Sequence, residues 1–264
     1  MNTTEIKYSP SINIIRDSNY KFNYMPTPNS IDVFNQLISN VNGKSKSQIV
    51  IGAYGSGKSS LLLAMKQTLS GIQNHFKYVK LKNFDYEFVS IVGTYGSFAQ
   101  AVADIFLPAK KNYTTKEIIT AIDKNYIQLQ KKKKGLFFIV DEFGKFLEYA
   151  AKNNPEAELY FLQEFAEWIN GAEKNTMFVA TLHQDFNAYS IVLNKSQKQE
   201  WDKVKGRFKE IVFNEPVEQL LYLAREHIHQ KFRHLPVEKN FDKLFKLIKQ
   251  SKAFALKDYL EINF

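Results

Sequence analysis

The sequence contains no cysteine, few arginines and no long apolar run, and each absence excludes a class of protein. Without cysteine the chain can form no disulfide, no thiolate metal site and no cysteine nucleophile. Only four of its 36 basic residues are arginine. No apolar run approaches the roughly 18 residues of a membrane span, and residues 1–10 lack the pattern of a signal peptide. The sequence therefore predicts a soluble, cytoplasmic protein with no membrane partner.

The remaining composition is that of a folded protein with an excess of positive charge. Of its 264 residues, 44% are hydrophobic and 14% aromatic, which is enough to bury the core of one large or two small domains. The formal net charge of +9 makes DNA a candidate partner, because basic surfaces attract polyanions. A lysine-rich composition without any such partner explains the same charge equally well.

Apolar segments and amphipathic segments alternate along the middle of the chain. Helical periodicity is found in residues 31–39, 59–69, 97–106, 115–130 and 155–170. Segments typical of strands occupy residues 48–51, 75–82, 135–140, 177–181 and 211–213. This alternation predicts an α/β fold with a mainly parallel sheet. After residue 216 the strands stop, and amphipathic helices follow around residues 217–228 and 241–248.

A phosphate-binding motif follows the first predicted strand. Residues 52–59 read GAYGSGKS and fit the pattern G-x-x-x-x-G-K-[ST] at every fixed position. Backbone N–H groups can surround phosphates only where no Cβ intrudes, and the helix that follows points its positive end at them. Lys58 would reach the β- and γ-phosphates, and the Ser59 hydroxyl would ligate Mg²⁺. The predicted nucleotide-binding residues are Gly52, Ala53, Tyr54, Gly55, Ser56, Gly57, Lys58, Ser59 and Ser60.

A second motif ends the apolar strand predicted over residues 135–140. Asp141 and Glu142 follow this strand directly, which places both carboxylates at the edge of the sheet where α/β proteins bind ligands. Asp141 is predicted to hold Mg²⁺, and Glu142 to deprotonate the water that attacks the γ-phosphate. Behind a complete phosphate-binding loop, this pair predicts a nucleotide and Mg²⁺ as the cofactors, and the resemblance described next implies that the nucleotide is ATP.

These two motifs, with a further strand between them, resemble the additional-strand catalytic glutamate class of P-loop NTPases. The order of the later elements is similar to that of AAA+ ATPases, nearest to the origin-recognition and STAND-like groups. The resemblance implies a three-layer sandwich whose parallel sheet has the strand order 5-1-4-3-2. It also divides the chain into an N-terminal arm and helix (1–45), a P-loop ATPase core (46–214) and the start of an α-helical lid (215–264), which the chain leaves incomplete.

The same resemblance implies roles for two further residues. The strand at residues 177–181 is similar to the sensor-1 strand, and Thr181, with His183 or Gln184 just beyond it, would contact the γ-phosphate or the attacking water. Arg207 is similar to an arginine that AAA+ proteins offer to the nucleotide of a neighbouring subunit, since a guanidinium suits phosphate oxygens. The alternatives are a turn-forming threonine and an ordinary surface arginine.

The aromatic residues of the N-terminal arm have two interpretations. Tyr20, Phe22 and Tyr24 lie where the resemblance places an arm that packs on adenine. Stacking on the nucleobase is the first interpretation, and plain packing of the arm on the core is the second.

Several short segments look like the P-loop ATPase subunits of bacterial anti-phage systems of the BREX type. These segments are residues 141–148, 182–184, 206–208 and 215–216. The resemblance implies that ATP hydrolysis drives a conformational change in a homo-oligomer or in a multi-protein complex.

Three other functions remain open at this point. A STAND-like switch would hold ATP and hydrolyse it slowly or not at all, although it would not need Glu142. A P-loop kinase would usually lack a glutamate directly after Asp141. A DNA-binding scaffold with a vestigial site would function without Lys58.

Overall fold

The computed structural model describes residues 12–40, 43, 45–77, 85–108 and 113–231. The chain divides into two units at the bond between Glu215 and Pro216, and each unit is considered by itself. Among the described residues, no helix is long and apolar enough to cross a membrane.

The first unit is built on a five-stranded, all-parallel sheet. Its strands are β1 (Ser47–Ile51), β2 (Asp85–Val92), β3 (Lys134–Asp141), β4 (Thr176–Leu182) and β5 (Lys209–Val212). Their order in the sheet is β2-β3-β4-β1-β5, and all four neighbouring pairs run parallel. This arrangement confirms the predicted α/β fold and the strand order 5-1-4-3-2.

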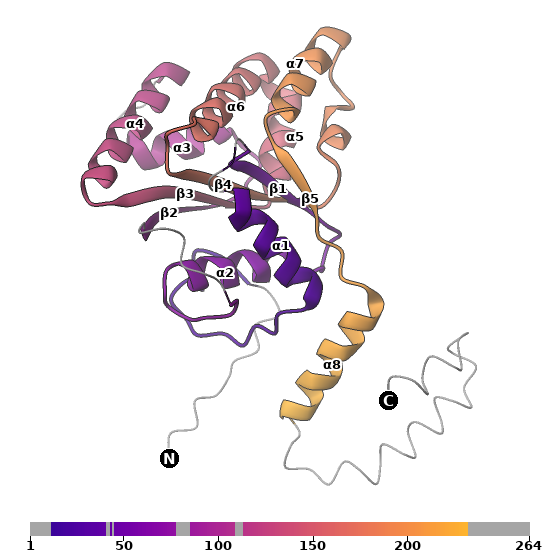
Figure 1. Ribbon diagram of the computed structural model, residues 1–264. Coiled ribbons are helices and arrows are strands. Elements are labelled where there is room, and N and C mark those ends of the chain that lie inside the picture. The colour runs from indigo at the N-terminus through magenta and orange to yellow at the C-terminus, as the bar shows by residue number, and fades with distance from the viewer. Residues whose placement is uncertain (1–11, 41–42, 44, 78–84, 109–112, 232–264) are drawn as a thin grey trace. The chain divides into compact units, whose positions relative to one another are not determined.

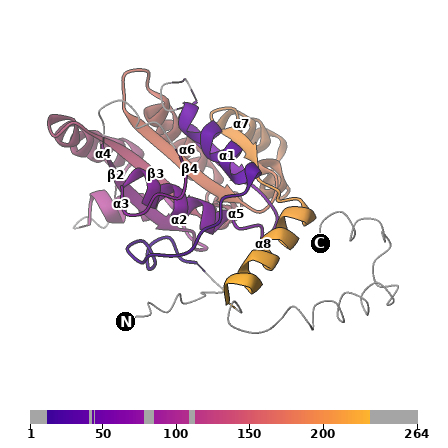
Figure 2. The ribbon, with the colours of Figure 1, turned by 60° about the horizontal axis from the view of Figure 1, so that its bottom comes forward.

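Helices cover both faces of this sheet and make it the middle of three layers (Figure 1). The helices α1 (Pro28–Ser39) and α2 (Lys58–Leu69) lie on one face, which Figure 2 brings forward. The other face carries α3 (Phe98–Phe106), α4 (Thr115–Lys131), α5 (Gly144–Asn153), α6 (Pro155–Asn170) and α7 (Lys195–Lys205). A short 3₁₀ helix, η2 (Phe186–Ser190), follows β4.

The two faces of the sheet carry separate hydrophobic cores because side chains alternate along each strand. In β3, Phe138 and Val140 belong to the core under α3–α7, whereas Phe137 and Ile139 belong to the core under α1 and α2. The core under α3–α7 is the more aromatic of the two. It also contains both tryptophans of the chain, Trp168 on α6 and Trp201 on α7.

The prediction of the second strand was wrong. Residues 75–77 are not in a strand, residues 78–82 lie outside the described residues, and β2 instead occupies Asp85–Val92. Both segments alternate apolar and polar side chains, and Asp85–Val92 pairs with β3, with Asp85 beside Lys134 and Val92 beside Asp141. Phe76, which suggested a strand, stacks on Phe34 of α1 with ring centroids 4.3 Å apart.

The aromatic side chains of the arm pack on the first unit itself. The ring of Phe22 lies 5.0 Å from that of His75, and the ring of Tyr24 lies 5.6 Å from that of Phe76. Tyr20 is 68% exposed. These contacts match the second interpretation of the arm, in which Phe22 and Tyr24 pack on protein side chains, and stacking on adenine stays a prediction.

The described part of the second unit is the helix α8 (Val217–Lys231). The sequence predicted an amphipathic helix at this position. The second predicted helix, around residues 241–248, lies outside the described residues.

Candidate functional site

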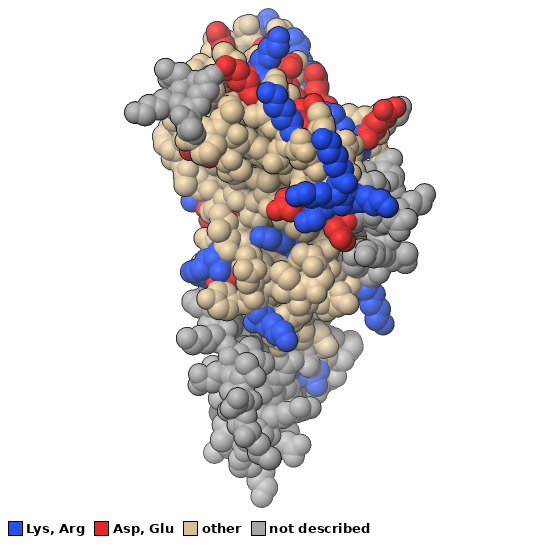
Figure 3. All heavy atoms as spheres, turned by 90° about the vertical axis from the view of Figure 1, so that its left-hand side faces the viewer, with Lys and Arg blue, Asp and Glu red and all other residues tan. Residues whose placement is uncertain are grey.

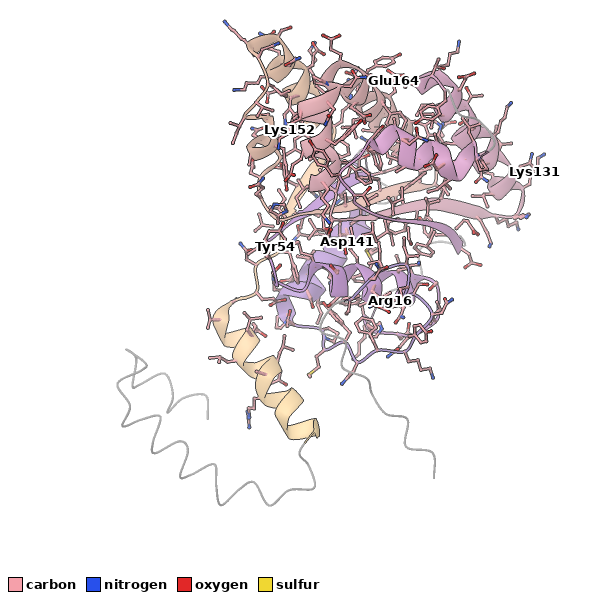
Figure 4. All side chains as sticks on the ribbon, turned by 180° about the vertical axis from the view of Figure 1, so that it is seen from behind. Arg16, Tyr54, Lys131, Asp141, Lys152 and Glu164 are labelled. Atoms are coloured by element: carbon pink, nitrogen blue, oxygen red, sulfur yellow. The ribbon has the colours of Figure 1, made fainter. Side chains whose placement is uncertain are left out.

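The predicted motif residues meet at the carboxyl edge of the sheet. The chain leaves β1 at Ile51 and enters the loop at Gly52, whose N–H donates to the carbonyl of Leu182 at the end of β4 (3.1 Å). Asp141 ends β3, beside β4 in the sheet. Figure 4 shows Tyr54 and Asp141 at this edge and Lys131 at the far end of the sheet. The fold therefore brings together two motifs that lie about 90 residues apart in the sequence.

Three glycines give the loop at residues 52–59 its shape. A Cβ atom on Gly52 would lie 2.1 Å from the carbonyl oxygen of Phe213, so only glycine fits there. Gly55 and Gly57 have φ angles of +76° and +88°, a region that glycine enters without strain. At both of these positions the space around the absent Cβ is open within 4 Å. The backbone can therefore approach a ligand closely at Gly55 and Gly57.

The first turn of α2 is open toward the loop. The helix begins at Lys58 directly after Gly57, and no side chain forms a cap there. The N–H groups of a helix's first turn have no partner within the helix, and together they favour an anion. Ser59 and Ser60 are half-buried in this turn. The buried hydroxyl of Ser56 has no hydrogen-bond partner among the described residues.

The side chain of Lys58 contacts the start of its own loop. Its ammonium donates to the carbonyl oxygens of Gly52 (2.6 Å) and Ala53 (2.7 Å). Burial lowers the pKa of this ammonium, and the nearby charge of Asp141 partly offsets the shift. An arriving phosphate would offer Lys58 charged oxygens in place of neutral carbonyls, which form weaker hydrogen bonds.

Asp141 and Thr181 form a buried hydrogen-bond pair behind the loop. Thr181 is 1% exposed, and its hydroxyl donates to Oδ1 of Asp141 (2.6 Å) and accepts from the N–H of Glu142 (3.0 Å). That N–H also donates to Asp141 Oδ1 (3.0 Å). Thr181 therefore orients Asp141. Its predicted contact with the γ-phosphate stays a prediction.

Glu142 has an unusual backbone and an exposed side chain. Its φ of +54° lies in the left-handed region, which costs a residue other than glycine about 1 kcal/mol. Its side chain is 46% exposed and forms an ion pair with Lys145 on α5. The backbone here touches Gly93 at the end of β2, where an added Cβ would lie 2.0 Å from the carbonyl oxygen of Glu142. The fold thus holds Glu142 at the mouth of the site.

Sequence reasoning missed an aromatic contact between the loop and the end of β4. The rings of Tyr54 and His183 stack with centroids 4.4 Å apart, although the Tyr54 side chain is 79% exposed. His183 Nδ1 lies 3.2 Å from the hydroxyl of Tyr189 in η2. Burial lowers the pKa of His183, and Lys58 lowers it further, while Glu148 and Glu142 raise it. His183 therefore lies close to the charged groups of the site.

Arg207 lies at the opposite edge of the same sheet. It comes just before β5 begins, and its backbone carbonyl accepts from the Asn170 side chain (3.0 Å). Its guanidinium forms an ion pair with Glu167 and donates to the Lys203 carbonyl (2.7 Å). Arg207 is thus separated from the chain's own phosphate loop by the length of the sheet. A role in catalysis would require the site of a neighbouring subunit.

The oxygen atoms at this edge fit Mg²⁺. The described residues contain no cluster of three or more His, Asp or Glu side chains that could hold a metal ion, and Mg²⁺ in nucleotide sites needs only one or two protein ligands beside phosphates and water. Asp141 uses Oδ1 in its bonds to Thr181 and Glu142 and keeps Oδ2 available. The Ser59 hydroxyl lies in the first turn of α2. These two residues are the predicted ligands.

Comparisons with known proteins support the fold and the loop. The sequence matches a family model described as the KAP family P-loop domain over residues 28–253. No curated protein matches the sequence. The fold is similar to the ORC2 protein of Aeropyrum pernix in ADPNP–ADP complexes, with a TM-score of 0.52 and 14% identity over 81% of this chain and 55% of that one. It is also similar to Drosophila ORC bound to DNA, with a TM-score of 0.51 and 14% identity over 88% of this chain and 57% of that one.

At this level of identity the two solved structures show the fold alone. The chain spans a little over half of the length of each. The predicted P-loop domain is confirmed, and the likeness to origin-recognition proteins is confirmed for the fold.

Proposed function

The chain belongs to the KAP family of P-loop domains, and on that premise we propose that it binds ATP with Mg²⁺ and hydrolyses its β–γ phosphoanhydride bond. One observation carries the proposal. The carboxyl edge of the sheet brings together an open glycine loop, the uncapped start of α2 and a buried aspartate with one free oxygen. This combination suits a polyphosphate with a bound cation.

Binding would begin at the loop of residues 52–60. The N–H groups of the loop and of the first turn of α2 would donate to the phosphates, and Lys58 would exchange its two carbonyl partners for phosphate oxygens. Asp141, oriented by Thr181, and Ser59 would hold Mg²⁺. When bound, this ion would neutralise the charge that develops on the β- and γ-phosphates.

Glu142 is the proposed base for hydrolysis. Its carboxylate would accept a proton from a water molecule as the water oxygen attacks the γ-phosphorus, and ADP would leave. The ion pair with Lys145 must open first, because a carboxylate paired with an ammonium is a weaker base. Exposed ion pairs of this kind contribute only about 0–1 kcal/mol, so this step costs little.

The ion pair also supports a second candidate function, a nucleotide-controlled switch with slow hydrolysis. Lys145 forms an ion pair with the proposed base. If Glu142 stays paired with Lys145 when ATP is bound, occupancy rather than turnover would control assembly.

The wider role of the chain is also a proposal. We assign residues 1–45 to an arm and helix, residues 46–214 to the ATPase core, and residues 215–264 to the start of a lid. The segments similar to BREX-type ATPase subunits support a role in an anti-phage assembly, with Arg207 facing a neighbouring subunit. The net charge of +9 and the likeness to an origin-recognition complex bound to DNA support DNA as a partner.

The decisive experiment compares binding and turnover in Glu142→Gln and in the control Glu173→Gln, which changes an exposed glutamate beyond the site. With ATP and Mg²⁺ we expect Glu142→Gln to bind ATP as the unaltered protein does and to lose at least 100-fold in turnover. The control should change neither. Full turnover in Glu142→Gln would remove Glu142 as the base. Tight ATP binding with negligible turnover in the unaltered protein would instead favour the switch. Repeating the binding measurement with GTP tests whether the site prefers adenine to guanine.

A further inference from the structure

A groove lies between the end of α3 and the outer side of α4, on the part of the first unit that carries none of the nucleotide-site residues. Its volume is about 850 Å³, and its lining comes from these two elements. The inner side of α4 packs into the core through Ile118, Ile122 and Tyr126. The groove is therefore a feature of the outer surface.

The floor of the groove is apolar and accessible. Ile105, Phe106 and Leu107 line it from the end of α3, and Ile127 lines it from α4. Ile105 is 45% exposed and Ile127 is 44% exposed. Large aliphatic side chains that share one concave surface are typical of a binding site for another molecule.

The rim of the groove is basic. Lys116 and Lys124 line it, and both are exposed. They are eight positions apart in the sequence, so they lie about 12 Å apart along the helix. In the part of the chain that the structure describes, neither ammonium has an ion-pair or hydrogen-bond partner. Figure 3 faces the side of the molecule on which α4 lies and shows basic and acidic side chains interspersed over it.

The two acidic residues of α4 hydrogen-bond to other groups than these lysines, and one of them, Glu117, also lines the groove. Glu117 accepts from the N–H (2.8 Å) and the hydroxyl (3.1 Å) of Thr114 and caps its own helix. Asp123 accepts from the indole of Trp168 (2.8 Å) and from Lys174 (2.7 Å) on the side toward α6. The outer side of α4 thus combines an apolar floor with unpaired positive charge.

We propose that this groove binds an acidic amphipathic helix of a partner protein. The apolar side of such a helix would cover Ile105 and Ile127, and acidic side chains seven or eight residues apart on one of its edges would reach Lys116 and Lys124. A second copy of this chain fits less well, because each copy carries a net charge of +9. The inference does not depend on ATP hydrolysis.

The test uses a fluorescein-labelled peptide of 18 residues with leucine at helical i, i+3, i+4 and i+7 spacing and glutamate elsewhere. A second peptide has the same leucines with lysine in place of glutamate. Binding to the full chain is followed by fluorescence anisotropy. The groove variants are Ile127→Asp and the double change Lys116→Glu with Lys124→Glu. The matched controls are Ile191→Asp and Lys198→Glu, which alter exposed residues elsewhere.

We expect the acidic peptide to bind, the basic peptide to bind at least tenfold more weakly, and each groove variant to lose at least tenfold in affinity. The controls should bind within twofold of the unaltered protein, and added salt should weaken binding because the lysines contribute through charge. The proposal fails if the acidic peptide does not bind at about 1 mM, if it binds the groove variants equally well, or if both peptides bind alike. It also fails if sedimentation shows a dimer that Ile127→Asp dissociates, because a second copy would then occupy the groove.

Discussion

Two lysines at opposite edges of the sheet make the same kind of contact with different consequences. Lys46, just before β1, donates to the carbonyl oxygens of Gly171 (2.7 Å) and Lys174. Lys58, just after the loop that follows β1, donates to the carbonyl oxygens of Gly52 and Ala53. Burial lowers the pKa of both ammonium groups. Each lysine therefore replaces hydration with two backbone carbonyls.

The surroundings of the two lysines separate a structural role from a binding role. Lys46 is 2% exposed, and Gly171, one of its partners, is the residue that ends α6. Lys58 lies on an open glycine loop beside Asp141, where its partners can be exchanged for those of a ligand. The amino edge of the sheet is thus closed by internal bonds, and the carboxyl edge keeps its bonding groups available.

Lys58→Ala should produce the largest effect and should affect binding alone. We expect ATP affinity to fall at least 100-fold, about 3 kcal/mol, because a charged donor to the phosphates is lost, and turnover to fall to background. The free energy of unfolding by denaturant should change by less than about 1 kcal/mol. Isothermal titration and denaturant unfolding measure the two quantities. A scaffold with a vestigial site would instead keep its function in this variant.

Lys46→Met should produce the reverse pattern. Two buried carbonyls would lose their donor, so we expect the free energy of unfolding to fall by about 2–4 kcal/mol. The folded variant should bind ATP within twofold of the unaltered protein at low temperature. Loss of ATP binding with no loss of stability would show that the two edges are not separate in function.

Two threonines of β4 allow a finer test within one strand. Thr181 donates to Asp141 at the carboxyl end, and Thr176 donates to the Ile169 carbonyl (2.7 Å) at the amino end. Thr176→Val removes one buried hydrogen bond and should cost about 1 kcal/mol of stability, whereas Thr181→Val removes the bond to Asp141 and the one from the Glu142 N–H and should cost about 1–2 kcal/mol. Only Thr181→Val should also lower turnover, by about tenfold. It should also raise the Mg²⁺ concentration at which turnover is half-maximal. Equal turnover in the two variants would remove Thr181 from the site.

Arg207→Ala should produce the smallest effect. Its ion pair with Glu167 is partly exposed, so we expect the free energy of unfolding by denaturant to fall by less than about 1 kcal/mol. Turnover of a monomer should be unchanged. A fall in turnover that appears only when size-exclusion chromatography shows an oligomer would support the proposed contact with a neighbouring subunit. A silent variant in an active oligomer would end that proposal.

The sequence predicted the elements that carry a strong local pattern. The loop at residues 52–59 has fixed glycines, and β3 is a continuous apolar run, so both were located within one or two residues. The predicted helix at 155–170 has the same bounds as α6, since Pro155 and Gly171 mark its ends. Together they were enough to predict the fold class, and the strand order came from the resemblance to AAA+ ATPases.

Contacts between residues far apart in the chain could not be predicted from the sequence. The choice of Asp85–Val92 over residues 75–82 as β2 depends on pairing with β3. The bond from Thr181 to Asp141, the position of Lys46 and the stacking of Tyr54 on His183 each join residues at least 40 apart in the chain. No local pattern distinguishes Lys46 from the other lysines, although burial of its carbonyl partners makes it a structural residue.

The placement of both tryptophans in one layer has a spectroscopic consequence. Trp168 is 9% exposed and Trp201 is fully buried, and both lie on the side of the sheet opposite α1 and α2. Intrinsic tryptophan emission therefore reports on α6 and α7 and not on the phosphate loop. A change in emission when nucleotide is added would mean that binding at the loop alters the surroundings of the tryptophans on α6 and α7. A Tyr54→Trp variant would provide a separate reporter on the loop itself.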